Sequence, residues 1–471
     1  MIELFGFGIA VLILVMITLG RRLSTDVFWS MTAGQWILTH HALFGTDAFT
    51  YTEPHRRWIA NEWGSDVVLA GLDRVFGNAA YNLFPIGTGL LSVGALWGYL
   101  RALGARGGRI AFALALFGYG ISSVIVQDRG LSFSLIWLPA ELWILTRARS
   151  NPRWLWLLAP LFVFWVNTHG SVLLGLAVIG IELAWSLAPE RSVARLGGFG
   201  QSRHTGPLAL SLVAALIACC LTPYGAGLLA DDLRVTFNGQ IGRYIQEWSS
   251  PDFHSIGLLI AFCVPLLVVL LVIRSRRLPL LELSLALVFL LATLHANRFI
   301  VYFFVAACGL AATFPSRAAW GRLARQALGI LTVGLCVVML GAPTVSAGSL
   351  ATSTPVAAFN FLASHPGRIF TEYAWEDYAV FRHRPTFVDG RTDYFTGSVL
   401  TEYMDVTNLT TRPDPVFDQY RVDYVIWARG APLSLYLERD PAWKVVDRTP
   451  QALVFARTSV GSPPGTSASF K

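Results

Sequence analysis

Carboxylates, histidines and single arginines gather in a few short segments between the long apolar runs of this sequence. At a boundary between apolar and aqueous surroundings a carboxylate can act as a general base, because partial burial and a nearby cation adjust its pKa. A single arginine at such a boundary can bind a phosphate group through two hydrogen bonds. The candidate catalytic residues are Asp26, Asp47 and Glu62, and the candidate substrate-binding residues are Gln127, Arg129, Asn167, His169, His295 and Arg298.

Asp26 follows the first apolar run and precedes the amphipathic segment "VFWSMTAGQWILTHH". It could be a general base or a metal ligand. It could also be the N-cap of a helix, because aspartate is a favoured cap residue. The loop that contains it, residues 21–79, is about 60 residues long, whereas most connections are only a few residues long. This length favours a functional role for the loop.

Asp47 and Glu62 lie in the same loop and each has a structural alternative. In "GTDAFTYT" Asp47 could bond to its own backbone in a turn. In "WIANEWGSD" Glu62 could be a helix-terminal carboxylate that faces the helix dipole. The loop contains no Asp-x-Asp pair, so its metal ligands, if it has any, stay unassigned.

The basic candidates also have structural alternatives. Arg129 and Arg298 are single and adjoin apolar runs, so they could bind a phosphate or extend toward lipid headgroups. His169, in "WVNTHGS", is either functional or a packing histidine at the membrane surface. His295 precedes Arg298 by three residues and is predicted to share a helical face with it. The segment "EWSSPDFHS", which contains Glu247, is interpreted as a helix end and turn.

Composition indicates the elements that position these residues. Hydrophobic residues make up 54% of the 471 residues and charged residues only 14%, and apolar runs of about 20 residues recur. The chain is therefore predicted to be an α-helical polytopic membrane protein. The net charge of +7 reflects arginines in short loops, so it indicates membrane topology and no nucleic-acid partner. The apolar segments are 2–20, 80–100, 110–126, 131–146, 154–166, 171–187, 208–222, 255–273, 279–294, 298–314 and 325–342.

Arginine placement predicts the topology. If 154–187 is a hairpin that turns at "WVNTHGS", five arginine triplets share one side of the membrane, which the positive-inside rule makes cytoplasmic. The chain then has about eleven spans, with a cytoplasmic N-terminus, an outward C-terminus and the candidate residues on the outer side. The triplets are Arg101, Arg106 and Arg109; Arg147, Arg149 and Arg153; Arg191, Arg195 and Arg203; Arg274, Arg276 and Arg277; and Arg317, Arg322 and Arg325.

The composition changes near residue 350. "TSTPVAAFNFLASHP" is predicted to be a helix, and "RIFTEY", "PTFVDG", "DYVIWA", "WKVVD" and "ALVFAR" are predicted strands. The predicted domains are a transmembrane domain over 1–347, an extracytoplasmic α/β domain over 348–458 and a disordered tail over 459–471. In "VDGRTD" the residues Asp389, Arg391 and Asp393 could bind a polar substrate, but a turn with internally paired charges and special backbone angles at Gly390 is favoured.

Several segments together resemble the GT-C superfamily of multi-spanning membrane glycosyltransferases, which includes protein mannosyltransferases, aminoarabinose transferases and the catalytic oligosaccharyltransferase subunit. The resemblance rests on a first span followed by a long outer loop with an early acid, Asp26, and two amphipathic helices. A largely uncharacterised bacterial branch is more similar still, on the segments "DVFWSMTAGQWILTHHALFGTDAFTYT", "WIANEWGSDVV", "WVNTHGSVLLG", "LTPYG", "EWSSPDF" and "FVDGRTDYF".

The resemblance implies an inverting transferase in the bacterial plasma membrane, part of the cell envelope machinery. The expected donor is a polyprenyl-phosphate-linked sugar, and the acceptor is a lipid, a glycan or a protein at the outer face among membrane lipids. Asp26 matches the expected acid of the first loop. No cofactor is assigned, although a divalent metal, Mg²⁺ or Mn²⁺, stays open. The alternative is a membrane transporter or a lipid or glycan flippase, but such proteins place polar residues near the bilayer midplane.

Overall fold

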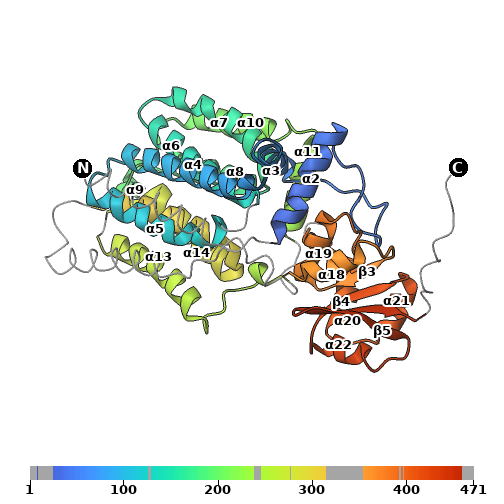
Figure 1. The fold of residues 1–471 in the computed structure, drawn as a ribbon. Helices are drawn as coiled ribbons and strands as arrows, with labels where there is room; N and C mark the ends of the chain where they lie inside the picture. The colour runs from blue at the N-terminus through green and yellow to red at the C-terminus, as the bar shows by residue number, and fades with distance from the viewer. Residues whose placement is uncertain are drawn as a thin grey trace. The chain divides into compact units, whose positions relative to one another are not determined.

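The computed structural model describes residues 8, 25–125, 129–237, 245–275, 277–314, 354–391, 394–395 and 397–458. The chain divides into two compact units, which Figure 1 shows as ribbons. The helical unit comprises residues 1–24, 34–43 and 59–346. The α/β unit comprises residues 25–33, 44–58 and 347–471. The predicted tail at 459–471 lies outside the described residues.

The helices of the helical unit coincide with the apolar segments of the sequence. Nine of the eleven predicted segments contain a helix, while 2–20, apart from Gly8, and 325–342 lie outside the described residues. The helices are α2 (Asp26–His40), α3 (Trp63–Phe76), η1 (Gly77–Ala79), α4 (Ala80–Ala102), α5 (Gly108–Ile125), α6 (Leu131–Ala148), η2 (Pro152–Leu157), α7 (Leu158–Thr168), α8 (Val172–Leu187), α9 (Glu190–Arg195), α10 (Thr205–Ala218), α11 (Ala226–Thr236), η3 (Gln246–Trp248), α13 (Ile256–Arg274), α14 (Leu280–His295), η4 (Asn297–Phe299) and α15 (Ile300–Thr313). The predicted break at "WVNTHGS" is confirmed, since α7 ends at Thr168 and α8 begins at Val172.

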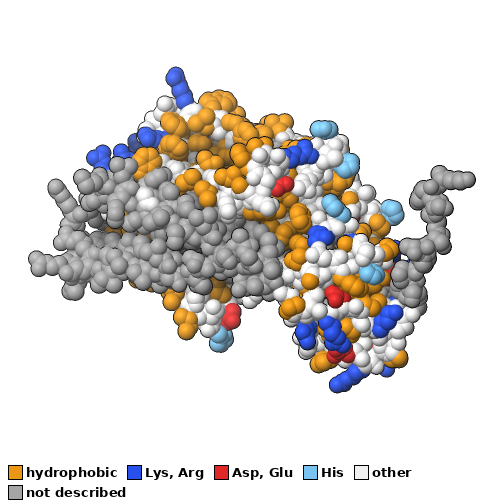
Figure 2. Space-filling model, in the orientation of Figure 1, with side chains coloured by type: hydrophobic (Ala, Val, Ile, Leu, Met, Phe, Trp, Pro, Cys, Tyr) orange, Lys and Arg blue, Asp and Glu red, His pale blue; other side chains and the backbone are white. Residues whose placement is uncertain are grey.

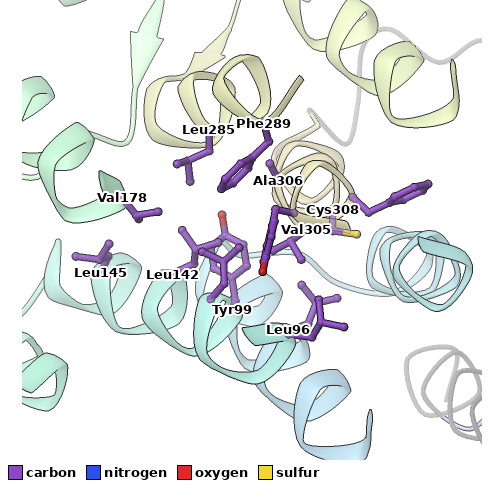
Figure 3. Close-up of a cluster of buried hydrophobic side chains, with 14 of the residues drawn as sticks. Leu96, Tyr99, Leu142, Leu145, Val178, Leu285, Phe289, Val305, Ala306 and Cys308 are labelled. Carbon is purple, nitrogen blue, oxygen red and sulfur yellow. The ribbon is translucent and has the colours of Figure 1, made fainter. Parts of the chain in front are cut away.

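Helix α15 lies at the centre of the helical unit. Every residue from Ile300 to Ala312 is buried, and the helix packs against α4, α5, α13 and α14. A helix that is apolar on all sides is stable only when neighbours surround it. In Figure 3, Val305 and Ala306 of this helix face Tyr99 of α4 and Phe289 of α14.

Helices α10 and α13 instead expose apolar side chains. Figure 2 shows hydrophobic side chains over the visible surface of the helical unit. Ile256 of α13 is 74% exposed, and Ile217 of α10 is 62% exposed. Large exposed apolar surfaces are rare on soluble monomers and are expected where lipid is the solvent. Residues 63–102 and 256–274 are each helical, long and apolar enough to cross a membrane; the number of spans stays a prediction.

The loops with arginine triplets meet at one end of the helical unit. Arg109 donates to the carbonyl oxygens of Ala312 and Phe314, each at 3.0 Å. Arg149 pairs with Glu182 at 3.1 Å, and the short strands β1 (Gly198–Phe199) and β2 (Leu278–Pro279) pair in parallel. Arg276 and the triplet from Arg317 to Arg325 lie outside the described residues. Which side of the membrane this end faces stays a prediction.

The α/β unit is built on a four-stranded mixed sheet. The strand order is β3-β4-β6-β5, with β3 parallel to β4 and the other pairs antiparallel. The predicted class of this unit is therefore confirmed. Its elements are α18 (Val356–Leu362), β3 (Ile369–Thr371), α19 (Tyr373–Phe381), α20 (Ser398–Thr407), α21 (Pro413–Gln419), β4 (Tyr424–Ala428), α22 (Pro432–Leu437), β5 (Trp443–Arg448) and β6 (Ala452–Arg457).

One predicted strand is wrong. "PTFVDG" does not join the sheet; its only bridge among the described residues pairs Thr386 with Thr50 of the first loop. Pro385 removes one backbone donor, while the N–H and carbonyl groups of Thr386 and the carbonyl of Phe387 bond to residues 49–52. The sequence-based boundaries placed the whole first loop with the transmembrane helices, so the assignment of 25–33 and 44–58 to the α/β unit was not expected.

A close helix crossing provides a test of the packing. A Cβ atom on Gly34 of α2 would lie 2.0 Å from the carbonyl oxygen of Asp66 in α3. Gly34→Ala is expected to lower the thermal unfolding midpoint in detergent and to cost about 2 kcal/mol, because the two helices must separate. Gly71→Ala in α3 is the matched control: no atom lies within 4 Å of its added Cβ, so helix propensity should stabilise it by up to about 1 kcal/mol. Equal midpoints in the two variants would contradict the crossing.

Candidate functional site

Glu62 and His169 meet at the end of the helical unit opposite the arginine loops. Glu62 is the N-cap residue of α3, but its side chain makes no capping hydrogen bond. Its carboxylate instead lies 3.3 Å from His169 Nε2 and accepts the backbone N–H of Gly130 at 3.2 Å. Glu62 is therefore a helix-terminal carboxylate, as the structural alternative had it, but it also joins three segments that are far apart in the sequence.

The hydrogen bonds of His169 define its tautomer. The backbone N–H of Ser171 donates to Nδ1 at 3.0 Å, and the Ser134 hydroxyl lies 2.9 Å from the same nitrogen. A backbone N–H can only donate, so Nδ1 accepts and the ring proton sits on Nε2, which donates to Glu62. Burial lowers the pKa of His169 well below its ordinary value, and Arg298 and Arg129 lower it further. His169 is thus a neutral ring that orients an anion.

Arg129 and Arg298 share one carboxylate, that of Glu247. Arg129 Nη2 lies 2.5 Å from Glu247 Oε2, and Arg298 Nη1 lies 3.7 Å from Oε1. The Arg298 guanidinium also lies 4.1 Å from the ring centre of Trp248. Burial raises the pKa of Glu247, but the two arginines outweigh it and hold the pKa below its ordinary value. The cluster therefore contains two cations and two carboxylates.

Sequence reasoning placed the two arginines, His169 and Glu62 among the site candidates but preferred a structural role for Glu247. It treated "EWSSPDFHS" as a helix end and turn, whereas in the structure Glu247 lies on η3, a single 3₁₀ turn that follows the extended residue Ile245. The available signal was an acidic residue beside a tryptophan in the same set of loops as the arginines. Position along the chain cannot show that Glu247 would meet arginines 118 residues and 51 residues away, because tertiary packing brings them together.

The other predicted binding residues of the helical unit lie elsewhere or have structural partners. Asn167 accepts from Trp63 Nε1 at 2.9 Å and donates to the carbonyl oxygens of Val163 and Leu221, so it holds α3 against α7. The prediction that His295 shares a helical face with Arg298 is wrong, because the extended residue Ala296 separates α14 from η4. Gln127 lies outside the described residues.

A buried arginine organises the α/β unit. Arg391 is 1% exposed and donates to Asp389 from Nε and Nη2 at 2.6–2.9 Å. Its Nη2 also donates to Asp47 at 2.6 Å. Asp47 accepts from the backbone N–H groups of Phe49 and Thr50 as well. The turn interpretation of Asp47 and the internal pairing of "VDGRTD" thus both agree with this geometry, whereas Asp393 lies outside the described residues.

Asp26 is the first residue of α2, where the helix dipole favours an anion. Phe28, two residues later, packs edge-on against Tyr378 of α19 with ring centres 5.1 Å apart. Asp377, next to Tyr378, is 2% exposed. Burial raises the pKa of Asp377 well above its ordinary value, and the negative charges of Asp26 and Asp389 raise it further. Asp26 therefore stands in an acidic environment that only the folded α/β unit creates.

Gly390 holds Asp377 in this environment. The backbone N–H of Gly390 donates to Asp377 Oδ1 at 2.7 Å. The prediction that Gly390 supplies special backbone angles is wrong, since its φ is not positive. Glycine is required here because a Cβ atom would lie 2.6 Å from Asp377 Oδ2.

Comparison with known proteins identifies the fold. No protein-family model and no curated protein match the sequence. The oligosaccharyltransferase AglB from Archaeoglobus fulgidus, in complex with an inhibitory peptide and a dolichol-phosphate, superposes with a TM-score of 0.59 and 11% identity over 98% of this chain and 75% of AglB. ArnT from Cupriavidus metallidurans, bound to undecaprenyl phosphate, gives 0.57 and 13% over 98% of this chain and 99% of ArnT.

The chain has the fold of the GT-C superfamily of membrane glycosyltransferases. This confirms the resemblance stated from the sequence. A second structure of the A. fulgidus oligosaccharyltransferase, in complex with zinc and sulfate, superposes with a TM-score of 0.57 and 12% identity over 91% of this chain and 68% of the other. Likeness at such low identity concerns the fold alone.

Asp47 and Asp389, the two acids that bind Arg391, do not fit a divalent metal. No group of three or more His, Cys, Asp or Glu side chains is arranged to hold a metal ion among the residues that the structure describes. Asp47 and Asp389 both bind the Arg391 guanidinium, whose positive charge opposes a second cation at the same oxygens. We therefore derive no reaction step through a metal.

The Arg391 cluster can be tested by substitution. Arg391→Lys is expected to destabilise the protein by about 3 kcal/mol or more, because lysine cannot bridge both carboxylates and leaves buried charge uncompensated. Arg448→Lys is the matched control, since Arg448 forms an exposed pair with Glu438 at 3.8 Å and should change stability by less than about 1 kcal/mol. Thermal unfolding of both purified variants measures the difference. Similar midpoints would mean that Arg391 is not essential to the unit.

Asp377 should make stability depend on pH. Its folded-state pKa is raised, so the native state binds the proton more tightly than the unfolded state. Stability is then lost as the pH rises from the ordinary carboxyl pKa of about 4 through the raised value. In Asp377→Asn the unfolding midpoint should fall less steeply over this range than in the wild type. Asp405→Asn, at a partly exposed acid of α20, should retain the wild-type slope; an unchanged slope in Asp377→Asn would contradict the assignment.

Proposed function

We propose that this protein is a glycosyltransferase that moves a sugar from a polyprenyl-phosphate donor to an acceptor at the outer face of the bacterial plasma membrane, with inversion at the anomeric carbon. The observation that carries the proposal is the pair of arginines, Arg129 and Arg298, gathered at one end of a helical unit with the GT-C fold. In this proposal the N-terminus is cytoplasmic and the α/β unit is extracytoplasmic.

The arginines serve the departing phosphate. When the bond between the anomeric carbon and the phosphate oxygen breaks, its electron pair remains on that oxygen, and the phosphate gains one negative charge. Cations held in place beforehand stabilise the charge that develops in the transition state more than they stabilise the ground state. Arg129 and Arg298 are 18% and 17% exposed in their side chains, so water screens them only partly.

Asp26 serves the acceptor. An acceptor hydroxyl forms the new bond to the anomeric carbon from the face opposite the phosphate, which inverts the configuration, and Asp26 takes up the hydroxyl proton. Asp26 lies close enough to Asp377 for its negative charge to raise the pKa of that carboxyl, after burial itself. Glu62, oriented by His169, is a fixed counter-charge to the arginines, and Asp47 is a structural partner of Arg391. The acceptor is a lipid, a glycan or a protein.

Sugar transfer by the purified full-length protein in lipid vesicles tests this function. With a panel of polyprenyl-phosphate sugars, Asp26→Asn is expected to lower turnover at least 100-fold, because general-base catalysis contributes about 10²–10⁴-fold. Asparagine retains the shape of the side chain and most of its preference for helix N-termini. Asp405→Asn is the matched control in the same unit and should keep full turnover, since its carboxylate bonds only to Thr410 among the described residues.

Each outcome has a defined meaning. Equal turnover in wild type and folded Asp26→Asn would remove Asp26 from the mechanism. Absence of transfer from every donor, with and without added Mg²⁺, would reject the transferase and leave the transporter or flippase alternative.

A further inference from the structure

The two carboxylates beside the arginine pair are held in different ways. Glu62 is fixed by two donors outside the pair, the Nε2 proton of His169 and the backbone N–H of Gly130. Glu247 bonds only to Arg129 and Arg298 among the residues that the structure describes. One anion therefore belongs to the framework of the site, while the other depends entirely on the arginines.

The carboxylate of Glu247 lies between the two arginines in the way that a bound phosphate group would lie between them. Its two carboxylate oxygens face two different guanidinium groups, Oε2 toward Arg129 and Oε1 toward Arg298. A phosphate presents the same arrangement, with two oxygens on one central atom, plus a further oxygen and up to one more negative charge. A phosphate can therefore replace Glu247 at both arginines without any movement of the arginines.

The side chain of Glu247 can also rotate away from the two arginines. Its side chain is 26% exposed, more than those of the two arginines. It stands on η3, a single turn of three residues. The turn is anchored beyond Glu247, where the backbone N–H of Asn297 donates to the carbonyl oxygen of Ser249 at 2.9 Å. Rotation about the side-chain bonds of Glu247 would free the arginines while this anchor stays in place.

We propose that Glu247 is a displaceable counter-ion that occupies the phosphate position between Arg129 and Arg298 and determines how tightly the site holds a lipid phosphate. This inference rests on the proposed function. The phosphate of the donor displaces Glu247 on binding, and the carboxylate returns when the product leaves. Glu247 thus sets the affinity of the donor site for the phosphate group.

The charge of the ligand determines how tightly the two arginines bind the donor and the product. The donor phosphate is a diester with one negative charge, whereas the released polyprenyl phosphate is a monoester with up to two. The arginines alone would therefore hold the product more tightly than the donor. A competing carboxylate lowers the affinity for the donor and the affinity for the product by the same factor, because either ligand binds only the fraction of protein from which Glu247 has moved away. This competition favours release of the product without changing the preference of the arginines for product over donor, and it persists at neutral pH because Glu247 stays ionised.

Binding of undecaprenyl phosphate to the detergent-purified full-length protein tests the proposal. The dissociation constant is obtained from the rise in thermal unfolding midpoint with ligand concentration. Glu247→Gln and Glu247→Ala are each expected to bind about tenfold more tightly than the wild type, since the competing anion is gone. Without ligand, both should unfold at slightly lower temperature, because the arginines lose their partner. Undecaprenol, which has the same tail and no phosphate, should not discriminate between the proteins.

Two matched variants separate displacement from a general charge effect. Asp252→Asn removes one negative charge from the same segment of the chain, where Asp252 pairs with His254, but leaves Glu247 between the arginines, so its dissociation constant should change less than about threefold. Glu190→Gln removes an exposed carboxylate that lies 3.6 Å from Arg203, and it should bind as the wild type does. Equal tightening in Asp252→Asn and Glu247→Gln would overturn the displacement, and so would unchanged or weaker binding in both Glu247 variants.

Variants of the two arginines in the same binding assay test the proposed donor site separately from the displacement of Glu247. Arg129→Gln and Arg298→Gln are expected to weaken binding of undecaprenyl phosphate in the presence of Glu247. If they have no effect, the arginines do not form the donor site and the proposed assignment fails. If they weaken binding while the Glu247 variants do not tighten it, only the displacement fails. If inorganic phosphate stabilises the Glu247 variants and undecaprenyl phosphate does not, the site recognises a soluble anion and the lipid assignment is overturned.

Discussion

The ion cluster of Arg391 with Asp47 and Asp389 is the constraint on which the α/β unit depends. It joins positions 344 residues apart in the chain, and all three side chains are withdrawn from water. A buried arginine is tolerated only when its charge is matched, and two carboxylates with several backbone donors match it here. The cluster thereby commits residues 44–58 of the first loop to the same unit as the sheet, and Asp26 belongs to that unit as well.

In the helical unit, too, charged groups pair with opposite charges, and these pairs lie at the ends of the helices. In an apolar solvent backbone groups must bond within helices, so charged groups collect where helices end. At one end the groups are Arg109, Arg149 and their partners. At the other end Glu62, neutral His169 and the pair of arginines around Glu247 form a network in which each charge has an opposite charge nearby. A network of this kind is stable before any ligand binds, yet one of its anions is replaceable.

The two units place carboxylates in opposite electrostatic environments. Asp377 is buried near other acids, and its pKa is raised well above the ordinary value. Glu247 is partly buried near two cations, and its pKa is lowered. A raised pKa suits a group that exchanges a proton near neutral pH, and a lowered one suits a group that acts as a permanent charge. Asp377 therefore keeps its proton at pH values at which Glu247 has already lost its own.

The sequence by itself determined the helical class, the break at "WVNTHGS", the mixed α/β character of the C-terminal residues and the gathering of polar groups in loops, because all of these follow from local hydrophobic pattern and chain length. Apart from the pairing within "VDGRTD", it did not reveal the partners of the charges. "PTFVDG" has the pattern of a strand, but a distant loop takes its hydrogen bonds. Glu247 looked like part of a turn, and Gly390 like a residue with unusual backbone angles. Only the tertiary structure decided these roles, since they depend on contacts between residues that are far apart along the chain.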